Sequence, residues 1–364
     1  MQLSEAKDGS SIITPLSGFP LFFVKRSPRI MTNNVWAVLS SFSQSLPKSK
    51  AFEALSYIDQ AQEFFIAAGS PKVKSRPVLY YYSYLNLVKA FLLHKSIQLP
   101  SFVKHGLTER DLNLNERYRF NGQRVNLFKK KTKDFNLAAV FIEQLGANVN
   151  KDKTFKVSEL MSHIPSVHRT WSIRQSAKSK GGFQPRLCPS SFYVLRKGKE
   201  FWVRMVVKKN DHEVSRTIAD VKGRKSFGKV FEEVKSTCSD ERWFETASEV
   251  GIKKGIDNAI YRLAEKVKAL NPSYVLAQEG YRFYIPTKKA RVALPQLALS
   301  FMIMFYLGSI TRYSPWDYSK LLNENTWLIS DFLENDPTQF LYGMASLIVE
   351  RDVVAPVSIE RHNS

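Results

Sequence analysis

The chain has 364 residues and a mass of 41.8 kDa, and 44% of its residues are hydrophobic, which is enough apolar material for a packed core. Its 54 Lys and Arg residues exceed the 33 Asp and Glu residues, so the formal net charge is +21 and the pI is about 9.8. These values exclude an intrinsically disordered chain and a collagen-like chain, and they favour a polyanionic partner.

The N-terminal part of the chain predicts two substantial helices. Residues 19–24 are apolar and could form a short strand or an extended arm. In residues 49–68 the apolar side chains recur every three to four positions, which is the spacing of an amphipathic helix. A second helix is predicted over residues 78–94, and because it is apolar on nearly all sides we expect it at the centre of the fold. Residues 107–136 lack a lasting period and predict loops and small elements.

The middle of the chain changes from a helical to a strand-like period. Residues 135–145 and 157–163 predict short helices, and residues 178–182 combine small side chains with positive charge, as in a flexible loop. Two runs of β-branched and aromatic residues within 191–209 are separated by a short basic turn, which indicates a β-hairpin. A third strand is predicted over residues 281–286.

Helical spacing dominates the rest of the sequence. The ranges that show this spacing are 227–234, 253–269, 294–310, 316–322 and 325–349. We expect the last of these to break near Asp336 and Pro337, because proline interrupts a helix. The sequence therefore predicts the α+β class, with predominantly helical lobes and a small antiparallel sheet.

Three domain-like parts are expected along the chain. Residues 1–150 predict a mainly helical N-terminal lobe, and residues 151–290 predict a basic loop and the small sheet with its helices. Residues 291–364 predict a C-terminal helical lobe that packs on the N-terminal lobe.

Cysteine usage and hydropathy predict a reducing, aqueous location. Cys188 and Cys238 belong to no CxxC motif or Cys/His cluster, so we expect no disulfide scaffold, metal site or cofactor. The N-terminus lacks the apolar core of a signal peptide. The most apolar run, 294–310, is interrupted by polar residues and falls short of the roughly 20 residues that span a bilayer. We expect a cytoplasmic protein that does not use a membrane as its partner.

Basic residues concentrate in three stretches, 110–133, 151–186 and 196–225, which could form one face. Nucleic acid is the expected partner, because neutralised phosphates release condensed counterions. Trp171 or Phe183 is expected to stack on bases. The residues expected to contact phosphates are Lys129, Lys130, Lys131, Arg174, Lys178, Lys180 and Arg186.

Motifs with a specific catalytic mechanism are absent from the sequence, including the P-loop, GxSxG, HExxH and a dinucleotide-binding glycine motif. Scattered polar residues in apolar surroundings remain as candidates for phosphate chemistry, and they are Arg76, Tyr82, Lys89, His105 and Arg312. Most of them also have a structural interpretation. His105 could bond a loop backbone, Lys89 could extend to the surface, and Arg312 could cap the preceding helix.

Four short segments carry a resemblance to a known family. They are Ala61, Phe64, Phe65, Ala67 and Ala68; the run from Arg76 and Pro77 through Leu79, Tyr81, Tyr82, Leu85, Asn86, Leu87, Lys89 and Ala90; His105, Gly106 and Leu107; and Leu307, Gly308, Ser309, Ile310, Arg312, Tyr313, Pro315 and Tyr318. Together they resemble the bacterial YaaC-like family over about residues 35–350. The resemblance implies a mainly helical, cytoplasmic bacterial protein and supplies little mechanism.

The tyrosine-rich helix also resembles HEPN domains, which are helical modules that often act as ribonucleases. Their signature is an arginine and a histidine with four to six residues between them, and no histidine of this chain has an arginine at that upstream spacing. Lys89 and His94 come closest, with the wrong cation. The resemblance therefore leaves HEPN-type cleavage in question.

Three functions follow from these patterns. The first is a nucleic-acid-binding subunit of a bacterial antiphage defence or nucleic-acid-processing assembly, with DNA and RNA both open. The second is a nuclease with a non-standard site among Arg76, Tyr82, Lys89, His105 and Arg312. The third is an adaptor that docks an acidic protein through the same basic face.

Overall fold

The computed structural model describes residues 11–15, 30–69, 74–110, 122–129, 135–178, 186–208, 212–250, 256–277 and 280–356. The chain divides into two compact units, each assembled from separated segments. The helical unit comprises residues 32–171 and 292–353. The sheet unit comprises residues 1–31, 172–291 and 354–364. The three-part division expected along the sequence stays a prediction.

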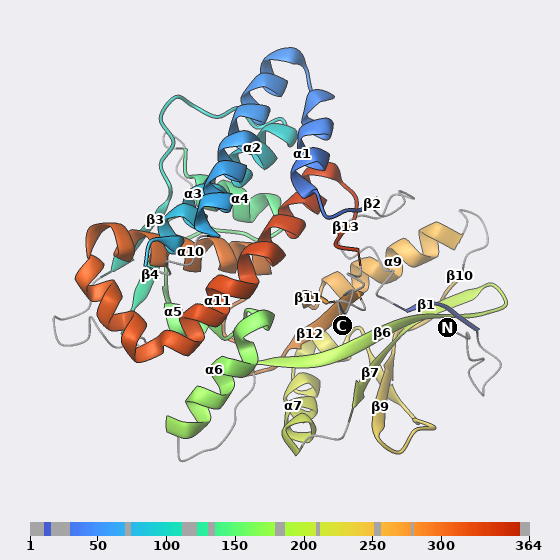
Figure 1. Cartoon of the computed structure of the whole chain (residues 1–364). Helices are drawn as coiled ribbons and strands as arrows, with labels where there is room; N and C mark the ends of the chain where they lie inside the picture. The colour runs from blue at the N-terminus through green and yellow to red at the C-terminus, as the bar shows by residue number, and fades with distance from the viewer. Residues whose placement is uncertain are drawn as a thin grey trace, which may run out of the picture. The chain divides into compact units, whose positions relative to one another are not determined.

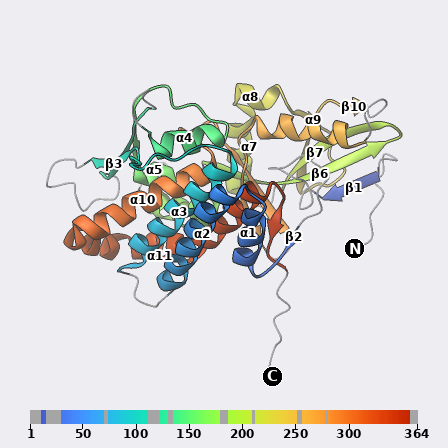
Figure 2. The same cartoon turned by 90° about the horizontal axis from the view of Figure 1, so that it is seen from above.

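Five helices build most of the helical unit (Figure 1). They are α1 (Val35–Gln44), α2 (Lys48–Ala68), α3 (Arg76–His94), α10 (Gln296–Tyr313) and α11 (Pro315–Val349). Helix α3 packs against α2, α10 and α11, and Figure 2 shows these helices side by side from above. The predicted helices over 49–68, 78–94 and 294–310 are therefore confirmed, and N-terminal and C-terminal segments share one core.

Helix α3 is buried on nearly every side, as its apolar composition predicts. Its Tyr84 ring stacks on Phe340 of α11 with ring centroids 3.7 Å apart. The Tyr84 hydroxyl donates to Asp336 Oδ2 at 3.0 Å, and Ser300 Oγ of α10 donates to Asp336 Oδ1 at 2.9 Å. The Asp336 carboxyl thus joins three core helices through polar bonds inside an apolar core, where such groups need partners.

The break expected in the last helix lies elsewhere. Helix α11 continues through Asp336 and Pro337, and its non-helical dihedrals fall at Asn325 (φ −136°, ψ 25°). Asn325 Nδ2 donates to the Leu321 carbonyl at 2.8 Å, so this side chain competes with the backbone ladder. The prediction near Pro337 is wrong because Asp336 is anchored by its core partners, which hold the helix together across the missing N–H.

Smaller elements complete the helical unit. The strands β3 (Leu107–Arg110), β4 (Arg124–Leu127) and β5 (Lys153–Lys156) form an antiparallel sheet in that order. Helices α4 (Leu137–Gln144) and α5 (Val157–Met161) confirm the two short helices predicted in this region. The small elements expected within 107–136 are thus strands at its start and near its end.

The sheet unit is built on an eight-stranded sheet within the described residues. Its central path runs β11-β12-β6-β7-β9-β8, with β1 paired to β6 and β10 paired to β7. The strands are β1 (Ser11–Pro15), β6 (Leu187–Lys197), β7 (Glu200–Lys208), β8 (Glu232–Val234), β9 (Glu241–Glu245), β10 (Glu249–Val250), β11 (Ser273–Ala277) and β12 (Gly280–Pro286). The predicted hairpin is β6–β7 and the predicted third strand is β12, which lies beside β6. The sheet is larger than the sequence predicts.

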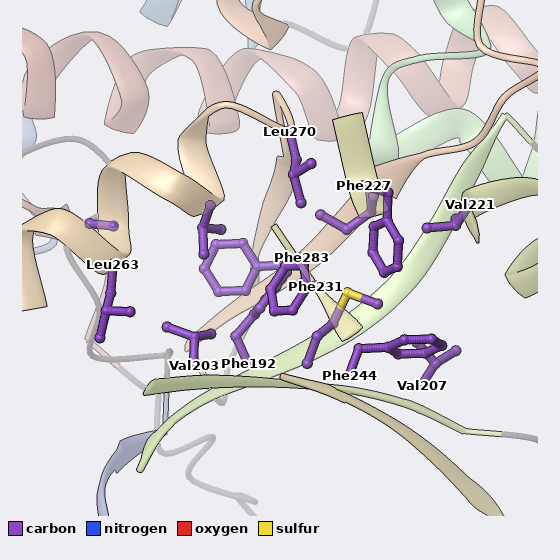
Figure 3. Close-up of a cluster of buried hydrophobic side chains, with 14 of the residues drawn as sticks. Phe192, Val203, Val207, Val221, Phe227, Phe231, Phe244, Leu263, Leu270 and Phe283 are labelled. Atoms are coloured by element: carbon purple, nitrogen blue, oxygen red, sulfur yellow. The ribbon is translucent and has the colours of Figure 1, made fainter. Parts of the chain in front are cut away.

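Three helices cover one face of this sheet: α7 (His212–Lys222), α8 (Lys225–Gly228) and α9 (Ile256–Lys268). Figure 3 shows Leu263 and Leu270 on one side of the core and Phe192 and Val203 on the strands opposite. The prediction of helix over 227–234 is wrong beyond α8, because that segment returns to the sheet as β8, which pairs with β9. The observed class is α+β and mostly helical, as predicted.

The remaining elements are α6 (Pro165–Lys178) and the short strands β2 (Ile30–Met31) and β13 (Val353–Val354), which pair with each other. None of the helices in the described ranges combines the length and hydropathy of a transmembrane segment.

Candidate functional site

The loop that follows α3 presents His105 beside a glycine with unusual backbone geometry. Gly106 has φ +75°, in the left-handed region that favours glycine. The Asn136 side chain fills the space where a Cβ of residue 106 would lie. Asn136 Nδ2 donates to the carbonyl oxygens of Phe128 and Lys129 at 2.6 and 3.3 Å. This packing fixes the loop and therefore the position of His105.

A close approach of two helices forms the other side of the site. A Cβ on Gly308 of α10 would lie 2.9 Å from Tyr81 Cβ and 3.1 Å from the Pro77 carbonyl oxygen of α3. Because glycine permits this contact, the end of α10 lies against α3. Arg312 Nη1 then donates to the Tyr82 hydroxyl at 2.6 Å.

The site also links the loop to α3 directly. The Tyr81 hydroxyl and His105 Nδ1 lie 2.7 Å apart, in a hydrogen bond whose donor depends on the imidazole tautomer. The Tyr82 ring stacks on Phe64 of α2 with centroids 5.3 Å apart. On α3, Lys89 lies seven residues after Tyr82 and so on the same helix face. We call Tyr81, Tyr82, Lys89, His105 and Arg312 the His105 cluster.

Electrostatics keep the imidazole of the cluster neutral. Although His105 as a whole is exposed, partial burial of its ring against Tyr81 lowers its pKa from the ordinary value of 6.5, and the positive charges of Lys89 and Arg312 lower it further. Burial also lowers the pKa of Lys89, against a smaller effect of Glu53, and burial raises the pKa of Tyr81. At neutral pH the cluster therefore holds a neutral imidazole, a protonated Tyr81 hydroxyl and two cations.

The cations of the cluster have no acidic ion-pair partner in the described part of the chain. The ion pairs among described residues include neither Lys89 nor Arg312. The Lys89 ammonium instead lies 4.9 Å from the centroid of the Tyr57 ring. Lys89 and Arg312 thus contact aromatic rings and a hydroxyl group, none of which neutralises a positive charge. The net charge of the cluster is therefore positive.

Four of the five predicted phosphate-chemistry residues meet in the cluster, and Arg76 does not. Arg76 begins α3 and forms an ion pair with Glu334 of α11. The structure therefore places Arg76 as a link between two core helices, apart from the other four candidates.

Next to the cluster, the corner between α10 and α11 exposes two aromatic rings, each paired with a cation. The Arg312 guanidinium lies 5.0 Å from the centroid of the Tyr313 ring, and the Lys320 ammonium lies 5.1 Å from that of Trp316. Tyr313 is 66% exposed and Trp316 is 69% exposed. We call Arg312, Tyr313, Trp316 and Lys320 the cation–aromatic surface.

Sequence reasoning missed Trp316 and Lys320 as functional residues. The available signal was their spacing of four residues in a predicted helix, which places a ring beside a cation. An aromatic residue in a helix usually belongs to the core, and only the structure shows this one exposed.

Of the residues predicted from the basic stretches, those that the structure describes are divided between the two units. Trp171 is 5% exposed and its ring lies against His168, so its face is not offered to a base. Arg186 Nη1 donates to the Lys289 carbonyl oxygen at 2.7 Å within the sheet unit. Lys129 is exposed after β4, and Arg174 lies in α6. Lys130, Lys131, Lys180, Phe183 and the side chain of Lys178 lie outside the described residues.

Metal ligation has no candidate in the ranges that the structure describes, where no three His, Cys, Asp or Glu side chains come together. Of the two cysteines, Cys188 is buried and Cys238 is exposed. The groups that the site does present suit anion binding, base stacking and proton transfer at His105.

Comparisons with known proteins identify a family. The family model described as YaaC-like Protein matches residues 25–348. No curated protein matches, and no solved structure matches. The weaker likeness to HEPN domains is not shown by these comparisons.

Proposed function

The chain belongs to the YaaC-like family, and we propose that it binds single-stranded nucleic acid through the cation–aromatic surface. The observation that carries this proposal is the pairing of two exposed rings with cations at one corner of the helical unit. Exposed rings stack on unpaired bases, and neighbouring cations bind the phosphates between them. Stacking tolerates every base, so the binding is independent of sequence.

Charge distribution supports this choice of surface. In the sheet unit several basic side chains are engaged in ion pairs, as at Glu233, which binds Lys222 and Arg242 at 2.5 and 2.7 Å. Glu249 in the same way binds two cations. Arg312 pairs with hydroxyl and ring groups and forms no ion pair with a carboxylate among the described residues, so its charge is available to a phosphate.

The setting of this activity belongs to the same proposal. The charge of +21 and the family resemblance support a cytoplasmic bacterial protein that acts within an antiphage defence or nucleic-acid-processing assembly. An acidic protein partner is the competing explanation of the charge.

Replacement of Trp316 by alanine is expected to weaken binding of a fluorescein-labelled single-stranded oligonucleotide about tenfold, because one base–ring stack is worth about 1–3 kcal/mol. Fluorescence anisotropy measures the affinity across a salt series, and wild-type binding should weaken steeply with salt. The matched control is Trp327→Ala, since Trp327 is also on α11 and 60% exposed but has no cation over its ring among the described residues.

Equal effects of Trp316→Ala and Trp327→Ala would contradict the proposal, as would binding that is insensitive to salt. If the wild-type protein does not bind the oligonucleotide at low salt, the proposal is wrong and an acidic protein is the favoured partner.

A second candidate function is cleavage of the phosphodiester bond at the His105 cluster. It is favoured by a neutral imidazole next to Arg312, which are a proton acceptor and a stabiliser of developing negative charge. A gel of the same binding mixtures tests it. Fragments that appear with wild type and not with His105→Gln would support cleavage, and intact oligonucleotide throughout would exclude it.

A further inference from the structure

The His105 cluster has an unbalanced set of hydrogen-bond donors. Arg312 uses one guanidinium nitrogen on Tyr82 in the described structure, although a guanidinium carries five N–H groups. His105 uses Nδ1 on Tyr81, which leaves Nε2, and the residue is exposed. Lys89 adds a second positive charge close enough to act on the imidazole. Glu53 acts on Lys89, but no carboxylate is bonded to His105 or Arg312 in the described structure.

Each member of the cluster is held in place by a rigid element. Tyr81, Tyr82 and Lys89 project from α3, which is the central helix of its unit. Arg312 lies in the last turn of α10, which Gly308 allows to approach α3. The loop of His105 is fixed by Gly106 and Asn136. Such preorganisation is what a binding subsite needs.

We propose that His105, Arg312 and Lys89 form a subsite for one phosphate group, with His105 Nε2 and the Arg312 guanidinium as its donors. The inference rests on the proposed function and deepens it. The cation–aromatic surface shares Arg312 with this subsite, so a strand stacked on Tyr313 would place a phosphate beside His105. The recognised chemistry is a phosphodiester or a terminal phosphate.

Phosphate in the subsite changes the protonation of His105. The groups that face the imidazole are Tyr81 and Lys89 on α3 and Arg312 and Phe305 on α10. None of these is anionic at neutral pH, so the incoming phosphate supplies the first negative charge beside the ring. The protonated imidazole can donate from Nε2 to phosphate while Nδ1 donates to the Tyr81 oxygen. Binding is therefore coupled to proton uptake by His105.

The test follows the His105 Cε1–H resonance of the wild-type protein by NMR as pH is varied. The resonance is assigned by its loss in His105→Gln. Spectra are recorded with inorganic phosphate, with the single-stranded oligonucleotide, and with sodium chloride at equal ionic strength. We expect the pKa of His105 to rise by about one unit with either phosphate ligand and to stay unchanged in chloride. His94, which is bonded to Ser43 at 2.9 Å, is the internal control and should not respond.

Affinity gives a second readout. A rise of about one unit in the pKa of His105 corresponds to about tenfold tighter oligonucleotide binding at pH below both values than at pH above both. This pH dependence should disappear in His105→Gln. Oligonucleotide binding at an unchanged pKa of His105 would overturn the subsite and leave the proposed function standing. A rise in the pKa of His105 with inorganic phosphate but no oligonucleotide binding would support the subsite and overturn the proposed function. Absence of both a pKa response and oligonucleotide binding would overturn the subsite and the proposed function together.

Discussion

Gly106→Ala is expected to destabilise the protein by about 3 kcal/mol or more. The left-handed φ of +75° costs a residue with a Cβ about 1–2 kcal/mol. The new Cβ would also collide with the Asn136 side chain. Asn136 would then lose its bonds to Phe128 and Lys129 and its role at the start of α4, where Oδ1 accepts from Ala139 N at 3.1 Å. A helix cap alone is worth about 1 kcal/mol. Urea denaturation measures the difference.

Two controls separate the collision from the backbone strain. Gly146 has φ +86° and open space around the position that a Cβ would take, so Gly146→Ala is expected to cost only about 1–2 kcal/mol. In an Asn136→Ala background the obstruction is gone, and Gly106→Ala should cost no more than Gly146→Ala. Equal costs of the two glycine variants in the wild-type background would contradict the proposed packing of the loop.

The helices that could be predicted are those whose period is unbroken. Residues 49–68 and 78–94 show regular apolar spacing, and α2 and α3 form there. Residues 227–234 leave the helical pattern because β8 pairs with β9, the next strand along the chain, and the period of 227–234 itself carries no sign of that pairing. Helix α11 passes Pro337 because Asp336 binds residues of α3 and α10. The spacing of apolar residues within one segment carries no information on such tertiary contacts, which override the segment's own propensity.

In the candidate site, too, some features could be predicted from the sequence and others depend on tertiary contacts. His105, Lys89, Tyr82 and Arg312 are identifiable as polar residues in apolar surroundings, but their meeting depends on the contact of Gly308 with Tyr81. Trp171 illustrates the opposite situation. Its basic neighbours in the sequence indicate a nucleic-acid contact, whereas its burial is decided by how α6 packs. Exposure of an aromatic ring is a property of the fold, so the cation–aromatic surface could not be predicted from composition.

The wild-type protein is expected to lose stability as pH rises, because Asp336 is buried in its core. Asp336→Asn should remove this loss. Burial raises the pKa of Asp336 from 3.8 to about 7, against the opposing hydrogen bonds of Ser300 and Tyr84. Between these two values the folded protein keeps a proton that the unfolded chain has released, so the free energy of unfolding falls with rising pH. The contribution lost by pH 8 is about 4 kcal/mol, at about 1.4 kcal/mol per unit.

His94 acts in the opposite direction over nearly the same range. Burial, aided by Lys95, lowers the pKa of His94 from 6.5 to about 4. Between these values the imidazole of His94 is protonated in the unfolded chain and neutral in the folded protein. The free energy of unfolding therefore falls as pH drops. The two effects offset each other in the wild-type protein between about pH 4 and 6.5, and its stability should therefore change little there on their account.

Single variants reveal each effect as a difference from wild type. The stability of Asp336→Asn relative to wild type should rise by several kcal/mol from pH 4 to pH 8, and that of His94→Gln should rise as pH falls from 7 to 4. Urea denaturation at each pH measures both, with Asp59→Asn on the exposed face of α2 as the matched control. A difference between Asp336→Asn and wild type that stays constant with pH would mean that Asp336 is ionised in the folded core. Three core helices would then meet at a buried charge, for which the hydroxyls of Tyr84 and Ser300 are the only described hydrogen-bond donors.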